Sequence, residues 1–340
     1  MSLKKIAELA NVSISTVSRV INGKSTKAAS KETQEKIFQI ARELSYVPNA
    51  YAQNLKQNIS PVAGPMKKLG IIFGRTSQIG SDPFFTILAR SIEKEVIKRG
   101  FTLTYTYIAS EFHEEVVLKE ILKTSELDGV FVLGRMDKNY YKMIREESRH
   151  MVYTGLNEIS SEFDQVIVDG YSAAMTAVHY LYQKGHRQIG YIGEKSNETR
   201  YKGYYDAMEE LELKIQPENI CHTKLSADGG YVEALKMIEK KSLHATAFFC
   251  ANDLTAIGAI KAFTEKGYLV PKEISVIGID DIETAQLISP SLTTIHIPLE
   301  EMGKTAAKLL LDRISEGTGL PLKVELPYTL IQRESVSNLK

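Results

Sequence analysis

Apolar positions in the first sixty residues recur at the spacing of helices. A first short helix is expected before Ser13. A second helix follows Ser13, whose hydroxyl can cap it, and a third is expected from about residue 32 to residue 44. No run in this part has the alternation of a strand, so the pattern predicts a small domain of three helices. The stripe of the first helix, at i, i+3, i+4 and i+7, consists of Leu3, Ile6, Ala7 and Ala10.

From Leu69 onward, short β-rich runs alternate with amphipathic helices, the first of which is expected at residues 83–99. Residues 58–66, which contain two prolines and a glycine, mark the boundary before this part. Such alternation is typical of parallel sheets covered on both faces. Because the strands are too many for one sheet, we expect two doubly wound lobes with a cleft where strand ends meet. The expected strands are LGIIFG, FTLTYTYIA, GVFVLG, HMVYTG, QVIVD, YIGE, AFFCAN and ISVIGID.

Charge is unevenly distributed along the chain. The 340 residues carry no net charge, but residues 1–60 hold nine Lys and Arg against four acidic residues. A net charge of +5 on the first part favours an anionic partner. No apolar run reaches the roughly 18 residues that a membrane span needs, and the start lacks a signal-peptide hydrophobic region. We therefore expect a cytoplasmic protein.

The second helix has a polar outer face in the stretch NVSISTVSRVING, residues 11–23. Two short helices joined by a tight turn, the second with such a face, are typical of a helix-turn-helix. Small hydroxyls let a helix lie close to base edges in a major groove, and an arginine can bond bidentately to guanine. Ile14, at the margin of this face, is placed to touch a thymine methyl. The outer face itself consists of Ser15, Ser18, Arg19 and Asn22.

A solvated surface helix in a small bundle is the alternative for this stretch. Periodicity alone favours that alternative. The charge of +5, the turn and the hydroxyl-rich face together favour DNA reading.

The sequence LKKIAELANVSISTVSRVING resembles the N-terminal signature of the LacI/GalR family of bacterial transcriptional regulators. The resemblance implies a DNA-binding domain with a hinge helix over residues 1–58, with Ile14 and Ser15 as the main specificity positions. Asn11 stands where the family usually has glycine in the turn, and asparagine is the side chain best able to replace glycine at positive φ. The further DNA contacts that the resemblance implies are Ser13, Thr16, Ser18, Arg19 and Asn22.

The segment YVPNAYAQNLKQ resembles the hinge helix of the family, at about residues 49–57. Asn49 can cap a helix so short that it is marginal alone, so it would fold where two copies pair on DNA. The resemblance implies that Ala52 lets the paired helices approach, that Leu55 enters the minor groove and kinks it, and that Tyr46 reaches a phosphate. A plain linker helix is the alternative. A linker at 59–67 would follow.

Residues 68–340 resemble the effector-binding and dimerisation core of the same family, which shares its fold with periplasmic sugar-binding proteins. The implied first lobe covers about 68–162 and 293–324, and the second covers about 163–292 and 325–340. The resemblance rests on the blocks GHRQIGYIGE, RYKGY, ANDLTAIGA, VIGIDD, SPSLTTIHIP and LIQRES.

Sugar recognition needs planar polar groups for neighbouring hydroxyls and an apolar face for the ring. Arg200, Asn252 and Asp280 lie just past expected strands or at helix starts, where the cleft should be, and they match family positions that bind the effector. Asp137 matches another such position, and Phe84 is a candidate for stacking on the ring. The neighbouring acids Asp253 and Asp281 are interpreted as helix caps.

No motif of a hydrolase or metalloenzyme is present, since the chain has no G-x-S-x-G, no H-E-x-x-H and no clustered Cys/His spacing. We therefore expect no enzyme activity, no cofactor and no metal. The expected function is repression of carbohydrate-utilisation genes by a homodimer on a pseudo-palindromic operator in double-stranded DNA, controlled by a small sugar between the lobes. The alternatives are a sugar-binding transport protein, a sugar-modifying enzyme, and a global regulator that works with a phosphocarrier corepressor.

Overall fold

The computed structural model divides into two compact units, Met1–Gly64 and Pro65–Lys340, and each is described by itself. In the first unit, the described residues are 7, 9, 10, 12, 13, 16, 17, 30, 33, 34, 36, 37 and 40. In the second unit, they are 67–75, 80–109, 115–240, 243–317 and 319–339.

The first unit buries apolar side chains at the expected helical spacing. Val17 and Ile37 are fully buried, and Ala7 and Ala10 nearly so. The cap expected at Ser13 is confirmed, because its hydroxyl oxygen accepts a hydrogen bond from the Thr16 amide at 3.1 Å. The other expected DNA contacts lie outside the described residues, as does Asn11; these are Ile14, Ser15, Ser18, Arg19, Asn22, Tyr46, Asn49, Ala52 and Leu55.

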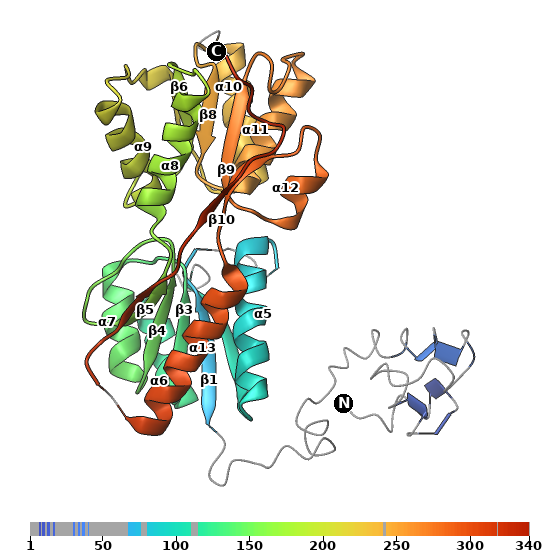
Figure 1. Ribbon diagram of the computed structural model, residues 1–340. Coiled ribbons are helices and arrows are strands. Elements are labelled where there is room, and N and C mark those ends of the chain that lie inside the picture. Colours follow the sequence, from blue (N-terminus) through green and yellow to red (C-terminus); the bar gives the residue numbers. More distant parts are fainter. Residues whose placement is uncertain are drawn as a thin grey trace. The chain divides into compact units, whose positions relative to one another are not determined.

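The second unit contains two six-stranded sheets, one in each of two lobes (Figure 1). The expected two-lobed α/β architecture is confirmed. The first sheet has the order β11-β5-β4-β3-β1-β2, and its paired strands are parallel. Its strands are β1 (Lys68–Phe73), β2 (Thr102–Ile108), β3 (Gly129–Leu133), β4 (Met151–Gly155), β5 (Asp164–Ile167) and β11 (Lys323–Glu325).

The second sheet has the order β12-β10-β9-β8-β6-β7. Its strands pair in parallel except β12, which runs antiparallel to β10. The strands are β6 (Ile189–Gly193), β7 (Ile220–His222), β8 (Ala247–Cys250), β9 (Ser275–Asp280), β10 (Thr293–His296) and β12 (Thr329–Ile331).

Helices cover both faces of each sheet. In the first lobe, α5 and α13 pack together on one face, and α6 and α7 lie on the other. In the second lobe, α8 pairs with α9, and α10 pairs with α11. The helices are α5 (Pro83–Lys98), α6 (Glu115–Ser125), α7 (Lys138–Glu147), α8 (Gly170–Gln183), α9 (Thr199–Glu210), η2 (Pro217–Asn219), α10 (Ala227–Glu239), α11 (Asp253–Glu265), α12 (Glu283–Leu287) and α13 (Leu299–Glu316).

Continuous apolar runs form the central strands because both faces of each sheet are covered. All residues of β3 and β4 are buried. Along β1, Leu69 and Ile71 join the apolar cluster of α5 and α13, whereas Ile72 joins that of α6 and α7. The alternation of side chains along a strand thus supplies two cores from one run of residues.

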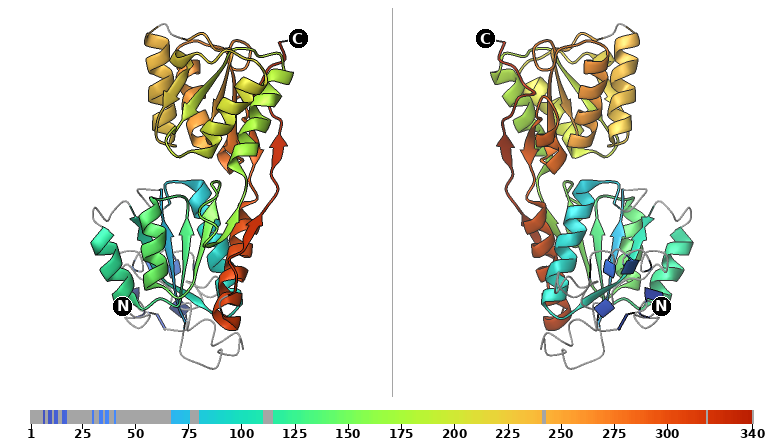
Figure 2. Two further views of the ribbon diagram at one scale, coloured as in Figure 1. Left: turned by 90° about the vertical axis from the view of Figure 1, so that its left-hand side faces the viewer. Right: turned by 90° about the vertical axis from the view of Figure 1, so that its right-hand side faces the viewer.

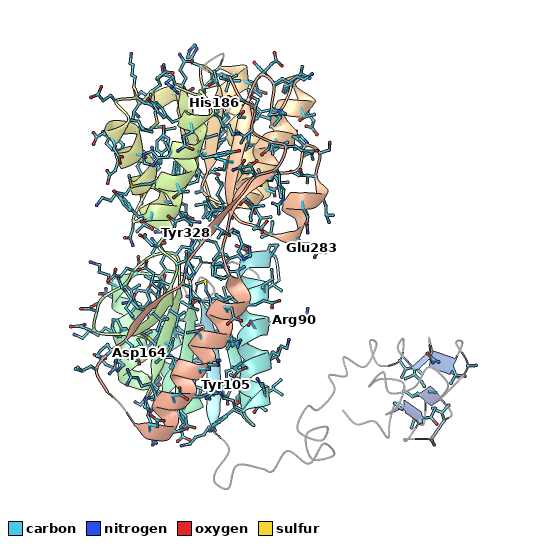
Figure 3. The ribbon with its side chains drawn as sticks, viewed as in Figure 1. Arg90, Tyr105, Asp164, His186, Glu283 and Tyr328 are labelled. Atoms are coloured by element: carbon cyan, nitrogen blue, oxygen red, sulfur yellow. The ribbon has the colours of Figure 1, made fainter. Side chains whose placement is uncertain are left out.

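Three described connections join the lobes. They are Val168–Asp169 between β5 and α8, Ile297–Pro298 between β10 and α13, and residues 326–328 between β11 and β12. The last of these runs along one side of the core in both views of Figure 2. Its Tyr328 hydroxyl lies 3.0 Å from the Thr176 hydroxyl of α8, at the level where the lobes meet (Figure 3).

The lobe boundaries differ from the expected ones by a few residues. Asp164–Ile167 and Glu325 belong to the first sheet, and Thr293–His296 belongs to the second. Each of these strands completes its hydrogen-bonded ladder before the chain crosses over. Asp164 is also held in the first lobe by Arg313 of α13, whose Nε donates to it at 2.9 Å (Figure 3).

Candidate functional site

A cavity of about 610 Å³ lies between the two lobes, at the carboxyl ends of parallel strands. This is the place where open α/β sheets bind ligands. Four of the five residues expected to bind the effector line it, namely Phe84, Arg200, Asn252 and Asp280.

Arg200 enters the cavity from the first turn of α9 and is 2 % exposed. The carboxylate of Glu198, the residue that caps this helix, accepts hydrogen bonds from Arg200 Nε at 2.7 Å and Nη2 at 2.9 Å. The remaining nitrogen, Nη1, donates to the Ala251 carbonyl at 2.7 Å. These bonds fix the plane of the guanidinium before any ligand arrives.

Glu198 in turn is surrounded by arginines. Burial raises the pKa of this carboxyl, but Arg200, Arg75 and Arg135 outweigh burial and lower the pKa to about 2. Glu198 is therefore ionised at neutral pH, and its negative charge holds the three cations at this edge of the cavity.

Asp280 ends β9 with a φ of +131°, a conformation that costs free energy for a residue with a side chain. It is 4 % exposed, and its Oδ1 has no hydrogen-bond partner among the described residues. Burial and the nearby Asp253 raise the pKa of Asp280 well above the ordinary carboxyl value, against the attraction of Arg200. A strained, buried carboxyl group with one unpartnered oxygen at a cavity is typical of a binding site.

Asn252 has a structural role as well as a place in the cavity wall. Its side-chain oxygen accepts from the Thr255 amide at 3.0 Å and so caps α11. Asp253, which we interpreted as the cap, instead accepts from the Thr294 hydroxyl at 2.6 Å and the Ile282 amide at 3.0 Å. Asp281 does not cap a helix either, because it pairs with His296 and Arg333.

Phe84 is nearly buried in the first turn of α5, with its ring edge-on to Phe85 at 5.1 Å. The helix starts at this point because Pro83 occupies its first turn and the Asp82 carboxylate caps it, accepting from the Phe84 amide at 2.9 Å. Asp82 also lines the cavity, and burial raises its pKa.

Asp137 does not line the cavity. It precedes α7 with an exposed side chain that makes no capping hydrogen bond. The structure therefore gives this residue no place in the site, although Gly134 and Arg135, three and two positions earlier, do line the cavity.

Sequence reasoning missed three residues that line the cavity from strand ends, Arg75, Arg135 and Glu194. Arg75 and Arg135 follow β1 and β3 of the first lobe, and Glu194 follows β6 of the second. The available signal was a Gly-Arg pair after two expected strands, FGR and LGR. Gly134 adopts a φ of +76° beside the Phe85 ring, which redirects the chain just before Arg135.

Two family models match the chain, one at each end. Residues 2–49 match bacterial regulatory proteins of the lacI family, and residues 178–336 match the periplasmic binding protein-like domain. The HTH-type transcriptional repressor MelR of Bacillus subtilis is 33 % identical over 98 % of this chain and 96 % of its own length. The chain belongs to the LacI family of bacterial transcriptional regulators.

Other transcriptional regulators match along the same length. The HTH-type transcriptional repressor PurR of Escherichia coli is 32 % identical over 99 % of this chain and 97 % of its own length. The solved complex of the transcriptional regulator CelR with cellobiose is 26 % identical, with a TM-score of 0.71 over 98 % of this chain and 99 % of that one. The chain is thus a DNA-binding regulator with an effector-binding core, not an enzyme.

Among the residues that the structure describes, no helix is both long and apolar enough to cross a bilayer. No group of three or more His, Cys, Asp or Glu side chains in the described ranges could hold a metal ion.

Proposed function

We propose that this LacI-family protein represses carbohydrate-utilisation genes and that a small sugar in the inter-lobe cavity controls its operator affinity. The observation that carries the proposal is the wall of the cavity. It combines the fixed guanidinium of Arg200 and the free carboxyl oxygen of Asp280 with the ring of Phe84. Planar polar groups beside an aromatic ring suit the hydroxyls and the C–H face of a sugar.

The relatives support a repressor rather than a transport protein. MelR and PurR are named transcriptional repressors, and CelR was solved with cellobiose. The match of residues 2–49 to the lacI family and the net charge of +5 on residues 1–60 also speak against a transport protein. Because its target is DNA, we place the protein in the cytoplasm.

DNA recognition is assigned to the second helix of the first unit and to the hinge. Ile14 and Ser15 determine which base sequence is bound, and Arg19 donates hydrogen bonds to guanine. In a homodimer on a pseudo-palindromic operator, paired hinge helices place Leu55 in the minor groove, with Ala52 at their contact. Further contacts to bases or phosphates come from Ser13, Thr16, Ser18, Asn22, Tyr46 and Asn49.

Sugar binding controls the DNA contacts through the lobes. A ligand that contacts Asp280 of the second lobe and Phe84 of the first changes the relative free energies of the lobe orientations. The hinge segments precede β1 of the first lobe in the chain, so their pairing responds to those orientations. By linkage, the operator must then change sugar affinity by the same factor.

Calorimetric titration of the full chain with a panel of neutral sugars tests the cavity assignment. Asp280→Asn should weaken the sugar that binds by roughly 10- to 100-fold, because the amide presents an NH2 group in place of one carboxyl oxygen and so loses a hydrogen-bond partner of the sugar. Glu209→Gln, an exposed change on α9 of the same lobe, is the matched control and should bind normally. Normal binding by Asp280→Asn would show that the sugar binds elsewhere.

A further inference from the structure

The three arginines at the cavity are already paired with carboxylates. Arg75 of the first lobe lies 3.2 Å from Glu194 and 3.7 Å from Glu198 of the second lobe. Arg135, also of the first lobe, pairs with Glu194 and lies 3.3 Å from Glu198. Arg200 is held by Glu198.

These pairs are shielded from water. The exposed fractions of the side chains are 16 % for Arg75, 13 % for Arg135, 25 % for Glu194 and zero for Glu198. Ion pairs in such an environment are screened less than surface pairs, so breaking one to release an arginine is costly.

The polar atoms that remain without a partner suit an uncharged ligand. Among the described residues that line the cavity, three buried atoms lack a hydrogen-bond partner: Arg135 Nε, Tyr153 Oη and Asp280 Oδ1. The first donates, the second can donate or accept, and the third accepts when ionised. Hydroxyl groups satisfy all three kinds of partner, since each hydroxyl both donates and accepts.

The formal charge around the cavity disfavours an anion. Counting the lining residues together with Glu198, four cations face five carboxyl groups. A phosphate near Asp280 would bring negative charge to a place where burial and Asp253 already disfavour it, as the raised pKa of Asp280 indicates. The cations are Arg75, Arg135, Arg200 and Lys224, and the acids are Asp82, Asp228, Asp280, Glu194 and Glu198.

We propose that the effector is an uncharged polyhydroxyl compound and that Glu194, by pairing with Arg75 and Arg135, excludes phosphorylated sugars and other anions. The inference rests on the proposed function and specifies the ligand class of the same site. It makes Glu194 a specificity-determining residue that acts by occupying cations, a case of selection against a competing ligand.

Calorimetric titration of the full chain with inorganic phosphate, at constant ionic strength, tests the role of Glu194 without a known effector. The wild type should show no saturable binding. Glu194→Gln removes one of the two carboxylates that pair with Arg75 and Arg135 and leaves Glu198 as their remaining partner, so its phosphate affinity should rise by about tenfold or more. Glu209→Gln removes an exposed charge from the same lobe and should behave as the wild type.

Saturable phosphate binding by the wild type, or equal absence of binding in the wild type and a folded Glu194→Gln, would overturn the inference. A second measurement needs no variant. It compares the affinities of glucose and glucose 6-phosphate, and it makes the same comparison between each neutral sugar that binds and the phosphate ester of that sugar. The neutral member of each pair should bind more tightly. A phosphate ester that binds more tightly than its neutral sugar and alters operator affinity would overturn the inference but leave control by a sugar derivative intact. If neither the neutral sugars nor their phosphate esters bind, the proposed function itself is overturned.

Discussion

Asp280 in the cavity wall and the neighbouring Asp253 are both buried carboxyl groups. Asp253 is fully buried, and both pKa values are raised, mainly by burial and also by the neighbouring acids. The folded protein therefore binds protons that the unfolded chain releases above the ordinary carboxyl pKa of about 4. The contribution of this pair to stability falls as pH rises from this value, by up to about 1.4 kcal/mol per pH unit for each proton.

Asp280→Asn should remove much of this pH dependence. The neutral amide carries no charge to desolvate, so the ligand-free variant should be more stable than the wild type at pH 8, and the difference should shrink towards pH 4. Denaturant unfolding of both proteins across that range measures the effect. A stability difference between the two proteins that does not grow from pH 4 to pH 8 would contradict the assignment.

Glu198 contributes a pH dependence of stability with the opposite sign. Its pKa is lowered to about 2, so its contribution is present above its ordinary pKa near 4.5 and is lost as pH falls towards 2. Glu198→Gln leaves Arg200 buried beside a neutral amide, which should cost about 3–5 kcal/mol of unfolding free energy at pH 7. Urea unfolding gives the value, with Glu209→Gln expected within about 0.5 kcal/mol of the wild type. An equally small loss for Glu198→Gln would show that the pair is not needed.

At the scale of elements, capping is readable from sequence and testable in the first unit. The Ser30 hydroxyl oxygen accepts from the Thr33 amide at 3.2 Å, as Ser13 does from Thr16. Ser30→Ala should destabilise the helix that follows by about 1 kcal/mol. Its amides should then exchange hydrogen roughly fivefold faster. Ser30→Asp keeps an acceptor and should restore protection; equal exchange in all three proteins would mean that the cap contributes nothing.

Long periodic elements could be predicted from the sequence, and short ones could not. The helix expected at 83–99 is observed at Pro83–Lys98, and the strand expected at LGIIFG overlaps β1. By contrast, β7, β11 and β12 have three residues each, too few for a pattern. They exist because neighbouring strands supply their hydrogen bonds.

The site could be predicted only where a motif marked it. Arg200, Asn252 and Asp280 were found through family blocks, whereas the inter-lobe pairs of Arg75 and Arg135 depend on how two strand ends far apart in sequence meet. The positive φ of Asp280 likewise has no local sequence signal, since the residue is not glycine.

At the scale of the whole molecule, the two lobes share one apolar cluster. It extends from Leu69 of β1 and Leu310 of α13 to Tyr204 of α9 and Ile277 of β9. Residues 65–340 should therefore unfold as one cooperative unit, with a calorimetric enthalpy equal to the van't Hoff enthalpy. Two separate transitions within this unit would show that the lobes are independent.

Whether a sugar in the inter-lobe cavity controls DNA binding is measured most directly by the affinity of the protein for its operator. Duplexes selected from a random pool by the full chain would provide the operator. Fluorescence anisotropy would then give its dissociation constant with and without the neutral sugar identified by calorimetry. We predict a change of about 5- to 150-fold with that sugar and none with a stereoisomer that does not bind. An unchanged dissociation constant at saturating sugar would contradict the claim.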